Sequence, residues 1–303
     1  MNMPWQVVIL LMLIPAYIIS PILNKKLVGS PSRPTSPRLK AQRQYWMYSY
    51  CFLLSLTFLL YTQEKSFDIF FFLIMAIGFI NSFAFYFYWQ AISINLSKAS
   101  IFKQPDDLVG IALGYLLLNE LKFINPAIVA GMLLIIASAL LFIWPKNKSK
   151  QEIQSLDKNK TLIKLIFYYS FIWGLAIFLM RYFAIQEISF TKFLLGWYGG
   201  AFLGSALLAF ISSRRISNLL LFKKQTLITL PLAFITWLSM ILSYWAFNLA
   251  PITVIQPISM ASEMILPCLI GLFYFKESKE LTKQEYIAIL IGFAGGIIIA
   301  FSY

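Results

Sequence analysis

The sequence predicts an all-α polytopic membrane protein with ten transmembrane helices in two inverted five-helix repeats. Three observations support this fold class: the composition, the succession of long apolar runs, and a weak internal repeat. Of the 303 residues, 60% are hydrophobic and only 12% are charged, whereas about a quarter of a soluble domain is charged. Transmembrane β-strands would appear as short alternating segments, which this sequence lacks, so helices are expected.

The apolar runs follow one another along the whole chain, and short charged or turn-forming stretches separate them. A helix needs about 20 apolar residues to cross the hydrocarbon core of a bilayer. The first run has neither the basic start nor the cleavage site of a signal peptide, so we expect it to be retained. The predicted spans are residues 4–23, 45–62, 68–92, 96–118, 124–144, 162–184, 192–212, 226–249, 253–275 and 284–302.

Two long polar stretches, residues 24–44 and 145–164, lie between these spans. The second stretch divides the chain into a first repeat (1–144), a basic polar linker (145–161) and a second repeat (162–303). The net charge is +13, and most of the 25 basic residues lie in the loops that follow odd-numbered spans. The positive-inside rule places those loops in the cytoplasm and both termini outside. The excess charge therefore indicates an anionic lipid bilayer as partner, and no nucleic acid.

Histidine is absent, and the two cysteines, Cys51 and Cys268, lie far apart inside apolar runs. This pattern argues against a disulfide framework or a zinc site. A Walker-type phosphate loop is also absent, so ATP is not expected to supply energy within this chain. We expect no metal and no cofactor.

An internal repeat relates residues 84–120 to residues 243–277. Each copy starts with an aromatic-rich run, continues through aromatic-x-x-Ala (Tyr88 and Ala91; Phe247 and Ala250), and closes a second run at Glu120 or Glu277. The copies lie five spans apart, and an odd number of spans inverts one half relative to the other. Inverted repeats are common in secondary transporters.

The five-plus-five layout, the aromatic-x-x-Ala turns and the two closing glutamates resemble the drug/metabolite transporter superfamily, in particular its EamA-like ten-helix members. Trp173-Gly174 in the sixth run and the glycine-rich last run are also similar, so the resemblance covers nearly the whole chain. It implies a carrier whose central cavity is lined mainly by helices 3, 4, 8 and 9. Two features depart from the family. Its members usually keep both termini in the cytoplasm, and the fourth span here carries more charge than the family pattern.

The fourth span contains Lys103, Gln104, Asp106 and Asp107 around Pro105. On a helix starting at Asn95, Asp106 lies roughly 16 Å along the axis, near the middle of a membrane. A charge at that depth is expensive and normally faces a bundle interior or water. One interpretation is a local ion pair that stabilises a kink at Pro105. It leaves one carboxylate unpaired, so we favour a polar substrate site or a proton-coupling group.

Glu263 in the ninth span lies 14 residues before Glu277, just as Asp106 lies 14 residues before Glu120. Inverted symmetry would bring these acids towards a common central site. We therefore expect Asp106, Asp107 and Glu263 to be the proton-coupling groups. Amide and aromatic side chains complete the expected substrate site with Lys103 and Gln104: Asn81, Tyr88, Gln90, Trp245 and Gln256. Aromatic walls beside acids would suit a cationic or amphiphilic substrate.

The closing residues Glu120 and Glu277 are interpreted as interfacial structural groups, and Arg181 as a side chain that snorkels to the surface. Taken together, the features predict a secondary active transporter of a small molecule, working by alternating access and either proton-coupled or an exchanger. We expect a monomer or homodimer in a bacterial inner membrane, and no enzymatic activity. The alternatives are a lipid-modifying membrane enzyme, with Asp106 and Asp107 holding Mg²⁺, and a channel or structural membrane subunit.

Overall fold

The computed structural model describes residues 4–30, 33–62, 67–119, 125–143, 150–213, 226–277 and 283–300. Apart from one antiparallel pairing of the two-residue segments β1 (Gly29–Ser30) and β2 (Arg33–Pro34), the regular structure of these parts is helical. Within these parts, six helical segments are long and apolar enough to cross a membrane: Trp5–Val28, Ile69–Ile94, Lys160–Ile185, Phe190–Ser212, Leu230–Leu249 and Ile252–Tyr274. The expectation of an all-helical membrane protein is confirmed at this level.

The helices follow the apolar runs along the chain. In order they are α1 (Trp5–Leu13), the π-helical η1 (Ile14–Ile19), α2 (Ser20–Val28), α3 (Pro37–Thr62), α4 (Ile69–Ile94), α5 (Leu96–Phe102), α6 (Pro105–Leu117), α7 (Pro126–Ile143), α8 (Lys150–Ile185), α9 (Phe190–Ser213), α11 (Leu230–Leu249), α12 (Ile252–Leu269), the π-helical η4 (Ile270–Tyr274) and α13 (Lys283–Ala300). Helix α8 starts at Lys150, inside the stretch expected to be a polar linker, because its Lys, Gln and Glu residues are themselves good helix formers.

The long helices are interrupted at related places in the two parts of the chain. Asn95 is extended (φ −158°) and separates α4 from α5, and Ala250 is likewise extended (φ −148°) between α11 and α12. Helix α6 and segment η4 are each followed closely by a residue with φ of +57°, namely Asn119 and Lys276. Each interruption frees backbone groups, and in a membrane those groups must find partners within the protein.

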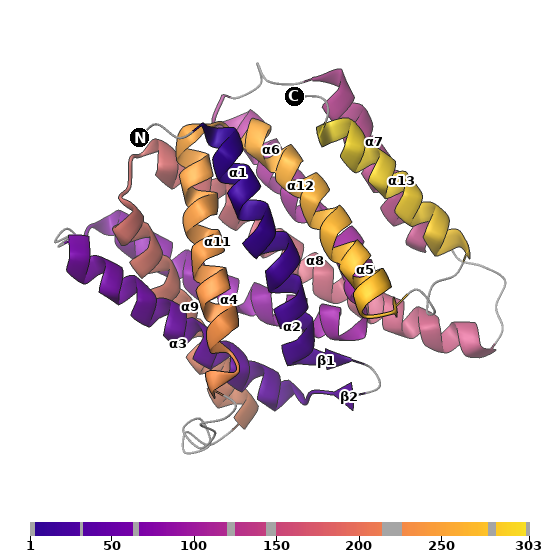
Figure 1. The fold of residues 1–303 in the computed structure, drawn as a ribbon, viewed down its shortest axis with the longest axis horizontal. Helices are drawn as coiled ribbons and strands as arrows, with labels where there is room; N and C mark the ends of the chain where they lie inside the picture. Colours follow the sequence, from indigo (N-terminus) through magenta and orange to yellow (C-terminus); the bar gives the residue numbers. More distant parts are fainter. Residues whose placement is uncertain are drawn as a thin grey trace.

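Close backbone approach joins α4 to α9. A Cβ atom added at Gly78 would overlap the carbonyl oxygen of Trp197, and one added at Gly200 would overlap that of Met75. Small residues allow such contact between membrane helices. Helices α7 and α13 lie side by side at one edge of the molecule (Figure 1). There Ser138 donates a hydrogen bond to the carbonyl of Ala288 at 2.6 Å.

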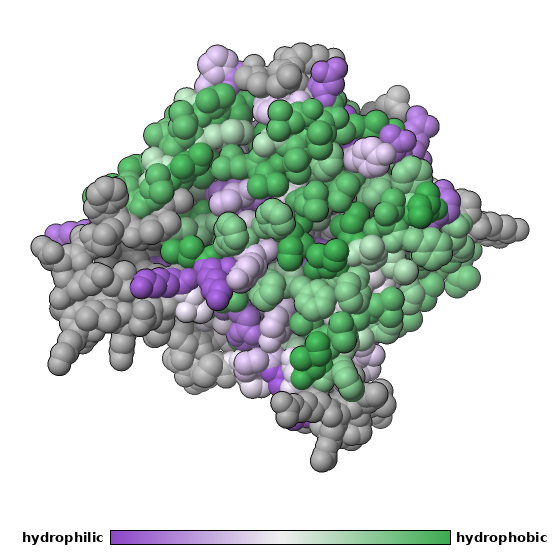
Figure 2. Space-filling view, turned by 180° about the vertical axis from the view of Figure 1, so that it is seen from behind, coloured by the Kyte–Doolittle hydropathy of each residue, from purple (hydrophilic) through white to green (hydrophobic). Residues whose placement is uncertain are grey.

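The outer surface is strongly apolar, as expected of a protein surrounded by lipid. Large side chains such as Leu60, Leu116 and Phe273 are 77%, 74% and 76% exposed. Figure 2 shows apolar residues over most of the coloured surface on the face behind that of Figure 1. An exposed apolar area this wide is unusual for a soluble monomer.

Candidate functional site

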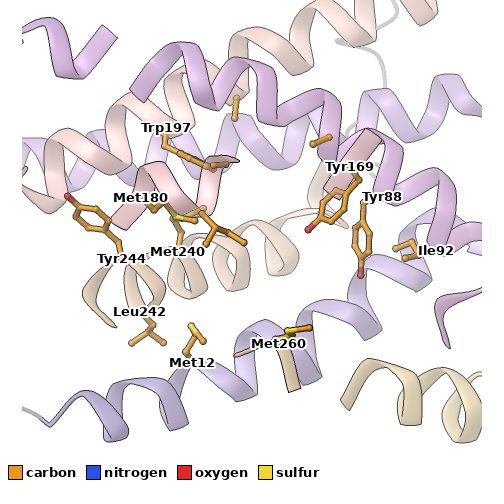
Figure 3. Packing of buried hydrophobic residues seen from close by; sticks show 14 of the residues in the cluster. Met12, Tyr88, Ile92, Tyr169, Met180, Trp197, Met240, Leu242, Tyr244 and Met260 are labelled. Atoms are coloured by element: carbon orange, nitrogen blue, oxygen red, sulfur yellow. The ribbon is translucent and has the colours of Figure 1, made fainter. Parts of the chain in front are cut away.

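A cavity of about 160 Å³ lies inside the helical bundle, with walls from the first helical segment (α1, η1 and α2), α4, α5, α8, α11 and α12. Its apolar walls include Met12, Met180 and Met240, and its aromatic wall includes Tyr88 and Tyr169, whose rings lie beside each other (Figure 3). Lys103 and Glu263 also line it, so charged groups face a space deep within the protein.

The charged wall is an ion pair that joins the two halves of the sequence. Lys103 follows the last residue of α5, and its ammonium contacts a carboxylate oxygen of Glu263 in the middle of α12. The two side chains are only 9% and 10% exposed. No cation lies near Glu263 in the sequence, and its partner comes instead from the other half of the chain.

The local fold explains why Lys103 emerges at this point. Pro105 has no backbone N–H and begins a new helix, so the chain is interrupted at Lys103 and Gln104. The carbonyl of Lys103 accepts hydrogen bonds from the backbone N–H of Asp106 (3.1 Å) and the hydroxyl of Ser170 on α8 (3.2 Å). The interruption is therefore anchored to a neighbouring helix.

Two further acids lie against this ion pair. Asp106 and Asp107 are fully buried, and carboxylate oxygens of Asp106, Asp107 and Glu263 all lie within 4.8 Å of one another. Gln256 on α12 donates to Asp107 Oδ1, but the Oδ2 atoms of both aspartates have no hydrogen-bond partner among the described residues. Buried charges need partners, and one lysine cannot neutralise three carboxylates, so the cluster calls for bound protons or a further cation.

Two tyrosine rings enclose the Lys103 ammonium from the other side. Its Nζ lies 5.2 Å from the ring centroid of Tyr88 on α4 and 5.0 Å from that of Tyr169 on α8. The rings are 5.2 Å apart, and Trp173 stacks on Tyr169 at 6.2 Å. Distances below about 6 Å are typical of cation–π contacts, so the ammonium is held by a carboxylate and two aromatic faces.

A second buried ion pair lies near the junction of α4 and α5. Glu277 Oε1 accepts from Lys25 Nζ at 2.8 Å and from the backbone N–H of Leu96 at 2.9 Å. Glu277 Oε2 accepts from the backbone N–H and the hydroxyl of Ser97, each at 2.9 Å. Lys25 Nζ also donates to the carbonyl of Ile92 at 2.6 Å. Glu277 thus occupies the N-terminus of α5, where the helix dipole favours an anion.

This arrangement corrects the interpretation of Glu277 as an interfacial residue. Its relative exposure is only 6%, because the positive φ of Lys276 turns the chain back into the bundle. Its expected counterpart, Glu120, lies outside the described residues. We call Lys25, Glu277 and the N-terminus of α5 the α5 cap.

Lys40, near the start of α3, contacts the end of α4. Its ammonium donates to Gln90 Oε1 at 3.0 Å and to the hydroxyl of Ser93 at 2.7 Å. Burial, with a smaller contribution from the charge of Lys25, lowers the pKa of Lys40 to about 8. This end of the bundle therefore holds several buried polar groups that contact one another.

The opposite ends of the helices carry fewer buried charges among the described residues. Arg181, expected to snorkel, donates from its guanidinium to the backbone carbonyl of Phe247. Lys192 pairs with the half-exposed Asp68 at 3.1 Å, and the Lys192 hydrogen bond lowers the pKa of Asp68.

The structure brings together six of the ten expected substrate-site residues: Tyr88, Lys103, Asp106, Asp107, Gln256 and Glu263. Gln104 is buried beside them, but its amide donates to the carbonyl of Ser100. Asn81, Gln90 and Trp245 are not among the cavity-lining residues of the described part. Gln90 instead binds Lys40, and Trp245 packs against the hydrophobic core.

Sequence reasoning did not select Tyr17, Tyr169 and Ser259, which also line the cavity. In α8, the Trp173-Gly174 pair could have indicated Tyr169, because Trp173 stacks on Tyr169. In the first run, Tyr17 lies between Pro15 and Pro21, and these prolines could have indicated it in the same way.

No protein-family profile and no curated protein matches this sequence. A solved structure described only as "Crystal structure of protein" is similar over 98% of this chain and 96% of its own, with a TM-score of 0.59 and 14% sequence identity. At that identity the similarity shows a shared fold and nothing about activity.

Proposed function

We propose that this chain is a secondary active transporter that moves a small molecule across a membrane by alternating access, with proton coupling or exchange. The observation that carries the proposal is the buried cluster of Lys103, Asp106, Asp107 and Glu263, which is contributed by both halves of the chain and reaches the cavity through Lys103 and Glu263. Charges inside a membrane bundle commonly mark substrate or proton pathways.

The proposal includes the ten-helix, inverted-repeat architecture of EamA-like drug/metabolite transporters. The matching interruptions at Asn95 and Ala250 support it. Lys25, late in the first helical segment, donates to the carbonyl of Ile92, three residues before Asn95. Arg181, late in α8, donates to the carbonyl of Phe247, three residues before Ala250. A basic residue thus contacts the same relative position in each half.

Helix packing supports the same architecture. Under the proposed repeat, α3 corresponds to α9, α6 to α12 and α7 to α13, and each of these pairs is in contact. Helix α4 contacts α8 and α9, while its proposed counterpart α11 contacts α1 and α3. The start of α1 and the end of α13 lie at the same edge of the molecule (Figure 1), as an even number of spans requires.

The α5 cap is a contact between the two halves of the chain. Glu277 follows η4 in the second half, whereas Lys25, Leu96 and Ser97 belong to the first half. Alternating access moves one half against the other around a fixed central site. We propose that opening towards this end separates Glu277 from α5.

A magnesium-dependent membrane enzyme is a weaker candidate. Asp106, Asp107 and Glu263 are close enough to share a metal ion. However, the ammonium of Lys103 contacts Glu263 and would repel a divalent cation at the same place.

Cysteine accessibility tests the carrier without knowledge of the substrate. Cys51 and Cys268 are buried, and replacing both with alanine gives a reference protein. Ser20→Cys and Ser239→Cys then place a thiol on the cavity wall, and Tyr61→Cys, at a position 85% exposed, is the control. A membrane-impermeant maleimide is applied to either side of oriented vesicles.

A carrier predicts that the cavity thiols react from both sides, while the control thiol reacts from one side only. Reaction of both cavity thiols from a single side would reject alternating access. In reconstituted vesicles, substrate accumulation driven by a gradient supports a carrier, whereas product formation without a gradient supports an enzyme.

A further inference from the structure

We propose that the substrate is an organic amine in its ammonium form, and that it competes with the Lys103 ammonium for a cation site formed by Glu263, Tyr88 and Tyr169. This inference rests on the proposed carrier function and names its substrate class. Lys103 would then act as a tethered cation that holds the site when substrate is absent.

The contacts of Lys103 are those that a free ammonium would make. Its Nζ touches one carboxylate oxygen of Glu263 and lies over the rings of Tyr88 (5.2 Å) and Tyr169 (5.0 Å). These three groups come from α12, α4 and α8, respectively, whereas Lys103 comes from the α5–α6 interruption. The cation site is therefore built by helices other than the one that carries its present occupant.

The charge balance favours a second cation in this region. Asp106 and Asp107 are fully buried, and each keeps one carboxylate oxygen with no hydrogen-bond partner among the described residues. A displaced Lys103 ammonium has these two acids beside it, because their oxygens lie within 4.8 Å of those of Glu263. The cluster of one ammonium and three carboxylates can therefore accept one additional positive charge. An anionic substrate would be repelled by the three carboxylates.

The rest of the cavity fits the hydrocarbon part of an amine. Met12, Met180 and Met240 line it away from the two tyrosines (Figure 3). Methionine side chains are flexible and adapt to apolar groups of different shape. The side chain of Lys103 itself corresponds to n-butylammonium, so this small amine is the natural probe.

The test uses the full-length protein, purified in detergent, and calorimetric titration with n-butylammonium. Lys103→Ala vacates the cation site, and Lys103→Met removes only the charge while keeping most of the volume. We expect each variant to bind n-butylammonium at least tenfold more tightly than the wild type. n-Butanol, which has the same chain without charge, should show no such gain.

A matched pair at Tyr169, made in the Lys103→Ala protein so that no tethered ammonium competes for the ring, tests the aromatic face of the site. Tyr169→Phe keeps the aromatic face, whereas Tyr169→Leu removes it; loss of a buried cation–π contact should weaken n-butylammonium binding roughly tenfold in the leucine variant only. Equal binding by the wild type and the Lys103 variants, an equal gain for n-butanol, or equal affinity of the two Tyr169 variants would overturn the proposal. If Lys103→Ala does not fold, the Tyr169 pair is made in the Lys103→Met protein instead.

Failure of this inference is separable from failure of the carrier. Cavity thiols that react from both sides, in a protein that binds no n-butylammonium, would reject the amine and leave the carrier. Selective n-butylammonium binding in a protein labelled from one side only would support the cation site and reject alternating access.

Discussion

Glu277→Gln is the most direct test of how the α5 cap stabilises the protein. The substitution keeps the shape of the side chain but removes its charge. In the wild type, the carboxylate accepts four hydrogen bonds, from Lys25, the backbone of Leu96, and the backbone and hydroxyl of Ser97. A glutamine has only one acceptor oxygen, so its NH₂ group must face at least one of these donors.

The expected destabilisation follows from burial of the partner. The Lys25 side chain is 3% exposed, so it cannot recover water when its counter-ion is lost. Breaking a buried ion pair by removing one partner costs about 3–5 kcal/mol. The remaining 2.6 Å hydrogen bond from Lys25 to the carbonyl of Ile92 reduces this loss. Each backbone donor left unsatisfied adds about 1–3 kcal/mol. We therefore expect a total of about 3–5 kcal/mol.

The assay is reversible unfolding in mixed micelles, followed by circular dichroism as the fraction of denaturing detergent increases. The double variant Lys25→Met with Glu277→Gln should lose less stability than the two single variants together, because no unpaired charge remains. We expect this difference, the coupling free energy, to be about 1–3 kcal/mol. Asp68→Asn is the control, because its pair with Lys192 is half-exposed and exposed ion pairs contribute little.

The reasoning is refuted if Glu277→Gln lowers the free energy of unfolding by less than about 1 kcal/mol, because removing one partner of a buried ion pair typically costs about 3–5 kcal/mol. Strict additivity in the double variant would do the same, because it would show that the two charges do not stabilise each other.

Three further predictions concern other parts of the molecule. Burial lowers the pKa of Lys40 from 10.5 to about 8, so the unfolded chain binds more protons than the folded protein between these values. The thermal midpoint should then rise with pH across that window, and Lys40→Met should abolish the slope. Gly200→Ala places a methyl group against the backbone of Met75, so we expect the free energy of unfolding, measured by denaturation, to fall by about 1–3 kcal/mol or more. Gly199→Ala is the control and should be tolerated, because its methyl group meets only the edge of the Phe52 ring at 3.4 Å. Glu263→Gln should reduce proton-coupled uptake at least tenfold in vesicles loaded with a pH-sensitive dye, and wild-type pH dependence in that variant would remove this acid from the mechanism.

Local features of the fold were accessible to sequence reasoning. The positions of the helices follow from apolar runs and from the need of a backbone in lipid to satisfy its own hydrogen bonds. Pro105 likewise predicts an interruption at Lys103, since proline cannot donate its backbone N–H to the preceding turn. These rules act over a few residues, so neighbours in sequence are sufficient to apply them.

Pairings between distant helices were not accessible in the same way. The local spacing allowed a pair between Lys103 and one of the aspartates, and it gave no sign that Lys103 would contact Glu263. Glu277 looked interfacial beside Lys276, yet it is buried against Lys25. Both outcomes depend on how each helix is rotated and tilted against its neighbours, and sequence periodicity does not specify this.

Composition and hydropathy alone determined that the chain is a helical membrane protein with buried carboxyl groups, because transfer of apolar surface and of charge into lipid has a large and local free energy. The tertiary structure decided which of those groups meet. Tyr169 and Tyr88, far apart in the chain, enclose one ammonium because α8 packs against α4, a contact between surfaces whose complementarity arises only when the helices assemble.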